Sequence, residues 1–301
     1  MNRSLSPAHL ALILAVTAVW GFTFVPIKVA LVEVPPFMLA AARFLLAAVP
    51  AVFFVRRPDM PWRGLFAYGF VIGVVQFGLM FLGMHLGMPA GLSSLVMQTQ
   101  VFFTIGLAIA FTGDRLQRRD ALGAIVAAAG VVVLGAYKIS EGATGTFAGF
   151  VAILVAAFAW AAGNLIAKRA GADHQVDGFS LVVWSSLVPP IPLALVSFAF
   201  EGGAGAFAAL AHASWLTWAC LLVMAWGATL FGFGAWNRLL HHYPMTVVSP
   251  FALLVPVSGL ASGAILLGER LSIVQAAGVL LVLAGLAVNV LGPAVARRLS
   301  L

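Results

Sequence analysis

The sequence is built from apolar runs of about twenty residues, separated by short segments that carry most of its charges. Of the 301 residues, 63% are hydrophobic and only 8% are charged, against about 25% charged residues in soluble domains. Runs of this length match the hydrocarbon thickness of a bilayer when they are helical. Apolar and polar residues do not alternate along these runs as they do along the strands of a membrane β-barrel. The sequence therefore predicts an all-α polytopic membrane protein.

The net charge of +7 does not indicate a nucleic-acid partner, because the basic residues lie at the ends of apolar runs. Cys220 is the only cysteine and lies in an apolar run, so neither a disulfide framework nor a thiolate metal site is predicted. No cofactor is predicted. The apolar run that follows Arg3 extends to Leu31, and we interpret it as an uncleaved first span rather than a signal peptide.

Ten apolar runs bounded by charges and turns are candidate transmembrane helices. Twelve Lys and Arg residues fall on one side of this arrangement and three on the other (Lys28, Lys138 and Arg270), with Arg43 inside a span. Positive residues accumulate in cytoplasmic loops, so we predict a multi-pass protein of the bacterial inner membrane with both termini in the cytoplasm. The runs cover Pro7–Leu31, Pro36–Val55, Gly64–His85, Leu92–Phe111, Ala121–Tyr137, Gly149–Lys168, Phe179–Phe200, Trp215–Trp236, Met245–Leu267 and Ile273–Leu291.

Two pairs of segments repeat along the chain. Trp20–Lys28 and Trp160–Lys168 each place a tryptophan eight residues before a lysine. Gly113–Leu116 (Gly-Asp-Arg-Leu) and Gly268–Leu271 (Gly-Glu-Arg-Leu) each close an apolar run. Two glycines follow each tetrapeptide at identical offsets, namely Gly123 and Gly130 in the first copy and Gly278 and Gly285 in the second.

These repeats divide the chain into two five-helix halves, residues 1–140 and residues 141–301. Because five is an odd number, the second half enters the membrane from the opposite side, and the two halves are inverted copies. Inverted repeats are typical of alternating-access carriers, whose substrate site lies near the bilayer midplane between the halves.

Trp20–Lys28, the segment Pro35–Ala47 and the two Gly-Asp/Glu-Arg-Leu tetrapeptides resemble those of the EamA-type members of the drug/metabolite transporter superfamily. The resemblance covers essentially the whole chain. Within that superfamily, the length and the aromatic content are most similar to those of the bacterial YddG-type amino-acid exporters. The resemblance implies ten helices and the export of small metabolites, but it does not identify the metabolite.

Polar and aromatic residues in the middle of spans are the candidates for a substrate site, because such residues face the bundle interior or a cavity. The spacing of Trp20, Thr23 and Phe24 puts them on one helix face, and Trp160 and Asn164 share a face of the sixth span. The predicted substrate-binding residues are Trp20, Phe24, Gln76, Met80, His85, Gln98, Trp160, Asn164, Trp226 and Ser249.

Each candidate has a structural alternative. Tryptophans near helix ends are usually interfacial anchors. His85 could equally be an interfacial histidine. Asn164 could form a hydrogen bond between helices, and Met80 could serve only in packing. Gln98 and Gln100 lie about 200° apart on a continuous helix, so only one of them can face a single cavity, and we select Gln98.

The predicted interior is nearly uncharged. All nine acidic residues fall in loops or at helix ends, so no carboxylate is expected at mid-membrane to bind Na⁺ or relay a proton. Arg43 is expected to snorkel to the outer surface, where it would bond helix-end carbonyls or pair with Glu33. Such an interior fits a neutral or zwitterionic molecule with an apolar side chain, such as an aromatic amino acid, and favours facilitated export.

Prolines and glycines indicate where the helices bend. Pro26 in the first span, and Pro250 and Pro256 in the ninth, remove backbone hydrogen bonds and permit kinks. Two GxxxG pairs let helices approach closely. We predict that the first, third, fourth, sixth, eighth and ninth spans gate the cavity.

Other functions are less well supported. The sequence has no His-Glu-x-x-His motif, no nucleophile elbow around Ser93 and no phosphate-binding Gly-x-x-x-x-Gly-Lys loop, so an enzyme is not predicted. A channel would carry a ring of charges or a carbonyl filter. A carrier of another cargo, such as a sugar derivative or a drug-like compound, is the main alternative. The sequence does not determine the exact cargo, its coupling to protons or the oligomeric state.

Overall fold

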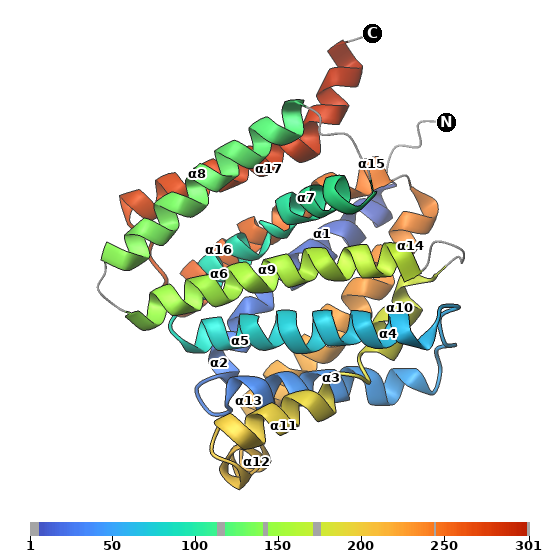
Figure 1. Cartoon of the computed structure of the whole chain (residues 1–301), viewed down its shortest axis with the longest axis vertical. Coiled ribbons are helices and arrows are strands. Elements are labelled where there is room, and N and C mark those ends of the chain that lie inside the picture. The colour runs from blue at the N-terminus through green and yellow to red at the C-terminus, as the bar shows by residue number, and fades with distance from the viewer. Residues whose placement is uncertain (1–5, 113–117, 141–143, 171–175, 244, 300–301) are drawn as a thin grey trace.

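The computed structural model describes residues 6–112, 118–140, 144–170, 176–243 and 245–299, and every regular element in these ranges is a helix (Figure 1). Seven helices in the described ranges are long and apolar enough to cross a membrane. Three shorter apolar helices, Pro36–Val52, Phe251–Leu267 and Ile273–Val288, accompany them. This is the architecture of a polytopic membrane protein. These helices coincide with the ten predicted runs, while the crossing of all ten stays a prediction.

Several of the apolar runs form interrupted rather than continuous helices. The first half contains α1 (Pro7–Phe22), α2 (Phe24–Ala30), α3 (Pro36–Val52), α4 (Trp62–Gly69), η1 (Phe70–Gln76), α5 (Phe77–His85), α6 (Ala90–Met97), α7 (Gln100–Thr112) and α8 (Arg118–Ser140). The second half contains α9 (Thr144–Ala170), α10 (Gly178–Ser185), α11 (Pro190–Phe200), α12 (Ala204–Ala211), α13 (Trp215–Leu222), η2 (Val223–Gly232), α14 (Phe233–His242), α15 (Met245–Val248), η3 (Ser249–Leu253), α16 (Leu254–Leu267) and α17 (Ile273–Leu299). The short α12 was not predicted, because a search for membrane-length runs passes over it.

Local chemistry explains where the helices are interrupted. Pro26 has no N–H to donate to the carbonyl of Phe22, and the first span breaks between α1 and α2, at Thr23. Pro250 lies in the 3₁₀ segment η3. Pro256 instead falls in the first turn of α16, where a missing N–H breaks no helical bond. The π-helical segments η1 and η2 occupy corresponding places in the third and eighth runs, and such segments are frequent at functional sites.

Helices α8 and α17 lie side by side along one edge of the bundle (Figure 1). A Cβ atom on Gly130 would lie 2.7 Å from the carbonyl oxygen of Gly278, and one on Gly285 would lie 2.5 Å from that of Gly123. The two backbones therefore touch, as in other helix pairs built on small residues. The repeated glycines thus pair crosswise, which is the pattern that a two-fold relation between inverted halves produces.

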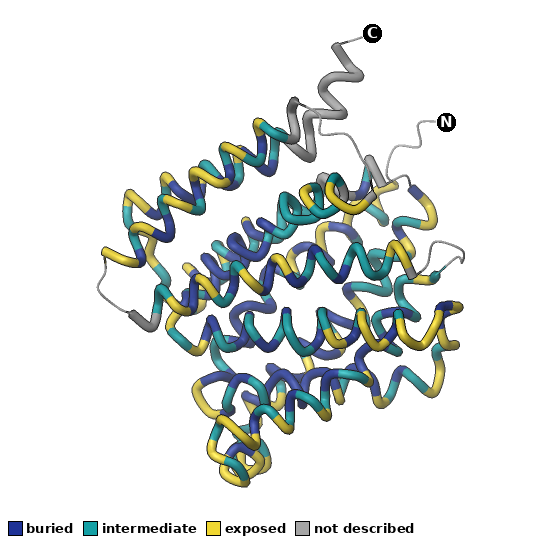
Figure 2. The backbone as a smooth tube through the Cα atoms, in the orientation of Figure 1, coloured by how far each residue is buried: buried dark blue, intermediate teal, exposed yellow. Residues whose placement is uncertain are grey.

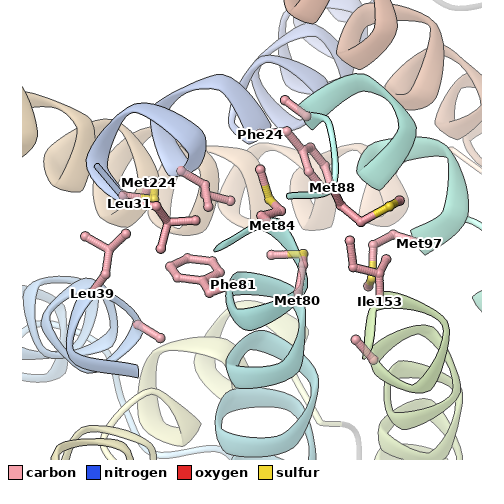
Figure 3. Close-up of a cluster of buried hydrophobic side chains, with 14 of the residues drawn as sticks. Phe24, Leu31, Leu39, Met80, Phe81, Met84, Met88, Met97, Ile153 and Met224 are labelled. Carbon is pink, nitrogen blue, oxygen red and sulfur yellow. The ribbon is translucent and has the colours of Figure 1, made fainter. Parts of the chain in front are cut away.

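The outer surface of the bundle is apolar. Phe54, Ile265 and Ile273 are 88%, 79% and 90% exposed, which lipid accommodates and water does not. Buried residues gather toward the middle of the bundle (Figure 2). The main core is rich in methionine, and its labelled members in Figure 3 are Phe24, Leu31, Leu39, Met80, Phe81, Met84, Met88, Met97, Ile153 and Met224.

Charged residues at one end of the bundle bond to backbone groups at helix ends. Glu201 accepts two hydrogen bonds from amides in the first turn of α3 (2.9 and 3.2 Å), and Glu269 accepts two from the first amides of α6 (2.5 and 2.9 Å). Lys28 Nζ donates to the carbonyls of Met84 and Met88 where α5 ends (2.6 and 3.1 Å). Each charge meets the opposite partial charge of a helix terminus, which ties this end of the bundle together.

Glu33 makes a similar contact at the start of α13, where it accepts from the Ser214 amide (2.7 Å) and the Thr217 hydroxyl (2.9 Å). These bonds, above all the one from the Ser214 amide, hold the pKa of Glu33 below its ordinary value of 4.5. Such a carboxylate stabilises the fold above its ordinary pKa and loses that contribution as the pH falls through the lowered value. We expect Glu33→Gln to lower the melting temperature at neutral pH and to have a smaller effect near about pH 3, measured by thermal unfolding in detergent. An equal loss at both pH values would contradict this role.

Candidate functional site

A cavity of about 270 Å³ lies in the bundle where the interrupted helices meet. Five of the interruptions contribute a residue to its wall: Thr23 between α1 and α2, Gln76 in η1, Gln98 between α6 and α7, Ala228 in η2 and Ala252 in η3. Irregular backbone at membrane depth is tolerated only where it is buried in protein or lines a cavity. The local breaks and the cavity therefore belong to one structural feature, to which both halves of the chain contribute.

Six of the ten predicted site residues line this cavity. His85 does not, because it is exposed at the end of α5. The side chain of Ser249 lies outside the described residues. Asn164 and Trp226 also lie elsewhere. The six that line the wall are Trp20, Phe24, Gln76, Met80, Gln98 and Trp160.

An aromatic wall closes one side of the cavity. Trp20 Nε1 donates a hydrogen bond to the carbonyl of Ala228 (2.9 Å), and its ring lies 5.2 Å from Phe233 and 5.1 Å from Trp236, measured between ring centroids. Gly232 permits this approach, because a Cβ there would lie 2.3 Å from Trp20 Nε1. Sequence reasoning missed Phe233 and Trp236. It ended the eighth run at Trp236, whereas α14 continues to His242 and places Trp236 inside the helix.

Gln98 and Gln100 both line the cavity, which corrects the prediction that only one of them can. The chain leaves helical geometry between Met97 and Gln100, so the 200° separation expected on a continuous helix does not apply. Gln98 Nε2 donates to the carbonyl of Ala252 (3.2 Å). Gln100 Oε1 accepts from Asn164 Nδ2 (3.4 Å), so the Asn164 side chain links α9 to α7.

Trp226 points away from the cavity. It is 49% exposed, its Nε1 donates to the carbonyl of Leu46 (3.1 Å), and its ring borders an apolar groove on the outer surface beside Phe53. Depth along a span does not determine the direction of a side chain. Trp226 also lies in the π-helical segment η2, where residues depart from the α-helical angular step. We therefore exclude it from the candidate site.

Arg43 lines the cavity, which corrects the expectation of an uncharged interior. It is 3% exposed and does not reach the outer surface. Its Nη2 donates to the hydroxyl of Thr229 (3.1 Å). The predicted partner, Glu33, instead accepts bonds from Ser214 and Thr217. Arg43 was recognisable in the sequence as the one basic residue well inside a span, but its direction depends on packing that hydropathy does not report.

The lining combines apolar surface with a few polar groups. Among its described residues none is Asp, Glu, His, Lys or Cys. No group of three His, Cys, Asp or Glu side chains in the described part of the chain could hold a metal ion. The wall offers aromatic faces, amides, the hydroxyls of Thr23 and Ser94, and one guanidinium. Such a surface recognises a small molecule that has an apolar part and a polar end.

Comparisons with known proteins point in the same direction. The EamA-like transporter family matches the chain twice, over residues 8–136 and 147–291. A protein of Salmonella typhimurium named "probable amino-acid metabolite efflux pump" is 45% identical over 287 residues, which cover 95% of this chain and 96% of that one. A protein of Escherichia coli K12 with the same name is 43% identical over 285 residues, covering 93% and 94%. One solved crystal structure, at 20% identity, superposes with a TM-score of 0.62 over 94% of this chain and 97% of that one, and so has the same fold.

Proposed function

The chain belongs to the EamA-like transporter family, and on that premise we propose that it exports small metabolites of the amino-acid class across the bacterial inner membrane. The observation that carries the proposal is the cavity, which both halves of the chain line and which lies where the helices are interrupted. The two relatives named as probable amino-acid metabolite efflux pumps support the cargo class. Both the exporter family and the cavity lining favour transport over catalysis.

The size and the lining of the cavity favour a small cargo with an apolar side chain. A volume of about 270 Å³ lies near the lower limit of ligand pockets, which run from about 300 to 1,000 Å³. An amino acid therefore fits better than a larger drug-like compound. The rings of Trp20, Trp160 and Trp236 offer apolar faces for stacking, which favours aromatic and other apolar side chains.

We propose that residues 1–140 and 141–301 are inverted halves that move relative to each other around this cavity. The crosswise pairs Gly130–Gly278 and Gly123–Gly285 support the two-fold relation. The distribution of Lys and Arg supports cytoplasmic termini. The break at Thr23, the π-helical segments η1 and η2, the α6–α7 junction and η3 are the proposed sites of bending, in the first, third, fourth, eighth and ninth spans. The sixth span, the remaining predicted gating helix, forms the continuous helix α9.

Transport in proteoliposomes tests this proposal. The purified protein is expected to take up labelled L-phenylalanine, or another apolar amino acid, with saturable kinetics and without a requirement for a pH gradient. Trp20→Ala removes an aromatic face from the cavity and is expected to reduce uptake by roughly tenfold or more. Trp215→Ala is the matched control, because Trp215 is 80% exposed and absent from the described lining.

Three outcomes would contradict parts of this function. A lack of saturable flux for every amino acid would end the proposed cargo class. Flux that rises linearly with concentration would indicate a channel rather than a carrier. Equal losses in Trp20→Ala and Trp215→Ala would remove the cavity from the transport path.

A further inference from the structure

Arg43 presents hydrogen-bond donors that the protein does not use. Its Nη2 is bonded to Thr229, but Nε and Nη1 are buried and have no partner in the described structure. The guanidinium carbon lies 3.9 Å from the centroid of the Phe77 ring and 5.1 Å from that of Phe44. These rings make cation–π contacts with the guanidinium. They do not accept hydrogen bonds from its free N–H groups.

A second residue with an unused donor lies in the same wall. Gln76 is 1% exposed, lines the cavity and has an unpartnered Nε2. It directly precedes Phe77, whose ring contacts the Arg43 guanidinium. Buried donors without partners are rare in proteins, and each calls for an explanation. Three of them in one cavity wall, two on a cation, indicate a site that an acceptor from outside the chain completes.

The charge balance identifies that acceptor. Glu33, Glu201 and Glu269 are engaged with backbone amides at helix ends, and none of the described lining residues carries a carboxylate. The cavity therefore holds one positive charge without a negative partner among its described residues. A planar guanidinium matches the two oxygens of a carboxylate and binds it with paired hydrogen bonds.

Building on the proposed export function, we propose that Arg43 and Gln76 bind the carboxylate of the cargo, and that the site does not require the cargo's amino group. A carboxylate that has no amine, or an acylated one, enters as a monoanion and neutralises Arg43. A free amino acid brings an additional ammonium for which the described lining offers amides and hydroxyls but no ionic partner. The cargo class therefore includes N-acylated and amine-free carboxylic acids with an apolar side chain, and it excludes amines that lack a carboxylate.

Binding to the purified full-length protein tests this assignment, with calorimetry as the readout and five related probes. L-phenylalanine, N-acetyl-L-phenylalanine and 3-phenylpropanoate carry the carboxylate, whereas phenethylamine and L-phenylalaninamide do not. The three carboxylates are expected to bind with similar affinity, and the other two probes roughly 30-fold more weakly or not at all. Arg43→Gln should abolish this preference, while Arg43→Lys, which keeps the charge but loses the planar fork, should retain part of it. Arg238→Gln is the control, since Arg238 is exposed and absent from the described lining.

The outcomes separate this inference from the function on which it rests. Equal binding of phenethylamine and 3-phenylpropanoate would overturn it, as would an unchanged carboxylate preference in Arg43→Gln. Much tighter binding of L-phenylalanine than of 3-phenylpropanoate would refute the independence from the amine. No binding of any carboxylate at millimolar concentration would also overturn the assignment. Carboxylate-selective binding without flux in proteoliposomes would instead refute export and leave the Arg43 site standing.

Discussion

Replacing Glu269 with alanine is expected to open the cavity at the end of the bundle where α6 begins. Glu269 belongs to the second half of the chain, yet it accepts hydrogen bonds from the Ala90 and Gly91 amides at the start of α6, in the first half. Charge-assisted bonds of this kind contribute about 1.5–3 kcal/mol each. Their loss shifts an equilibrium between closed and open arrangements by roughly tenfold or more, because about 1.4 kcal/mol corresponds to a factor of ten.

The Glu269 carboxylate lies where α16 packs against the start of α6. A Cβ on Gly263 would lie 2.4 Å from Glu269 Oε2 and 3.2 Å from the Gly91 amide nitrogen, so α16 packs closely against the start of α6 beside this carboxylate. Met97, further along α6, lines the cavity. An alanine at position 269 removes the acceptor of the first two amides of α6 and one of the contacts that hold the two helices together at this end.

Thiol labelling measures the effect. In a Cys220→Ala background, a Met97→Cys variant carries one cysteine, in the cavity wall. In the proposed topology, a membrane-impermeant maleimide added to intact cells should label it roughly tenfold faster or more when Glu269 is alanine. Glu201→Ala is the control, because it removes a helix-capping carboxylate from the same end without touching α6. Identical labelling rates with and without Glu269 would show that the contact does not close the cavity.

The sequence was sufficient to locate the long apolar helices, although not the short α12, because each long apolar run can satisfy its backbone in lipid only by becoming helical. The predicted run Gly149–Lys168, for example, lies within α9, Thr144–Ala170. Mid-span position also located part of the cavity wall. Trp20, Gln76 and Gln98 line it, since polar and amphipathic side chains at that depth avoid lipid.

The direction in which each side chain points was less predictable, because it can be inferred only where the helix keeps a constant rotation per residue. That rotation is not constant at the α6–α7 junction, where both Gln98 and Gln100 reach the cavity, and in η2, where Trp226 turns outward. Arg43 illustrates a second limit. Its position is set by the Phe77 ring and the Thr229 hydroxyl, which lie on other helices, and hydropathy along α3 contains no information about them.

Replacing Gly285 with leucine is expected to destabilise the protein while leaving its binding site intact. A Cβ at this position would lie 2.5 Å from the carbonyl oxygen of Gly123 and 2.7 Å from the amide nitrogen of Ala127, both backbone atoms that cannot rotate away. Overpacking of this kind costs about 1–3 kcal/mol, which corresponds to a melting temperature lower by roughly 4–10 °C. None of the described lining residues comes from α8 or α17, so ligand affinity of the folded protein should not change.

Two further variants are needed to interpret the result for Gly285→Leu, one as a control and one as a test of the two-fold relation. Gly106→Leu is the control, because no atom lies within 4 Å of a Cβ there, and leucine favours a helix more than glycine does. Gly130→Leu should cost about as much as Gly285→Leu, because Gly130 meets the Gly278 backbone at the position related by the proposed two-fold axis. If thermal unfolding gave a loss for only one of the two, the halves would not be joined symmetrically. If neither lost more than Gly106→Leu, backbone contact between α8 and α17 would not be what holds them together.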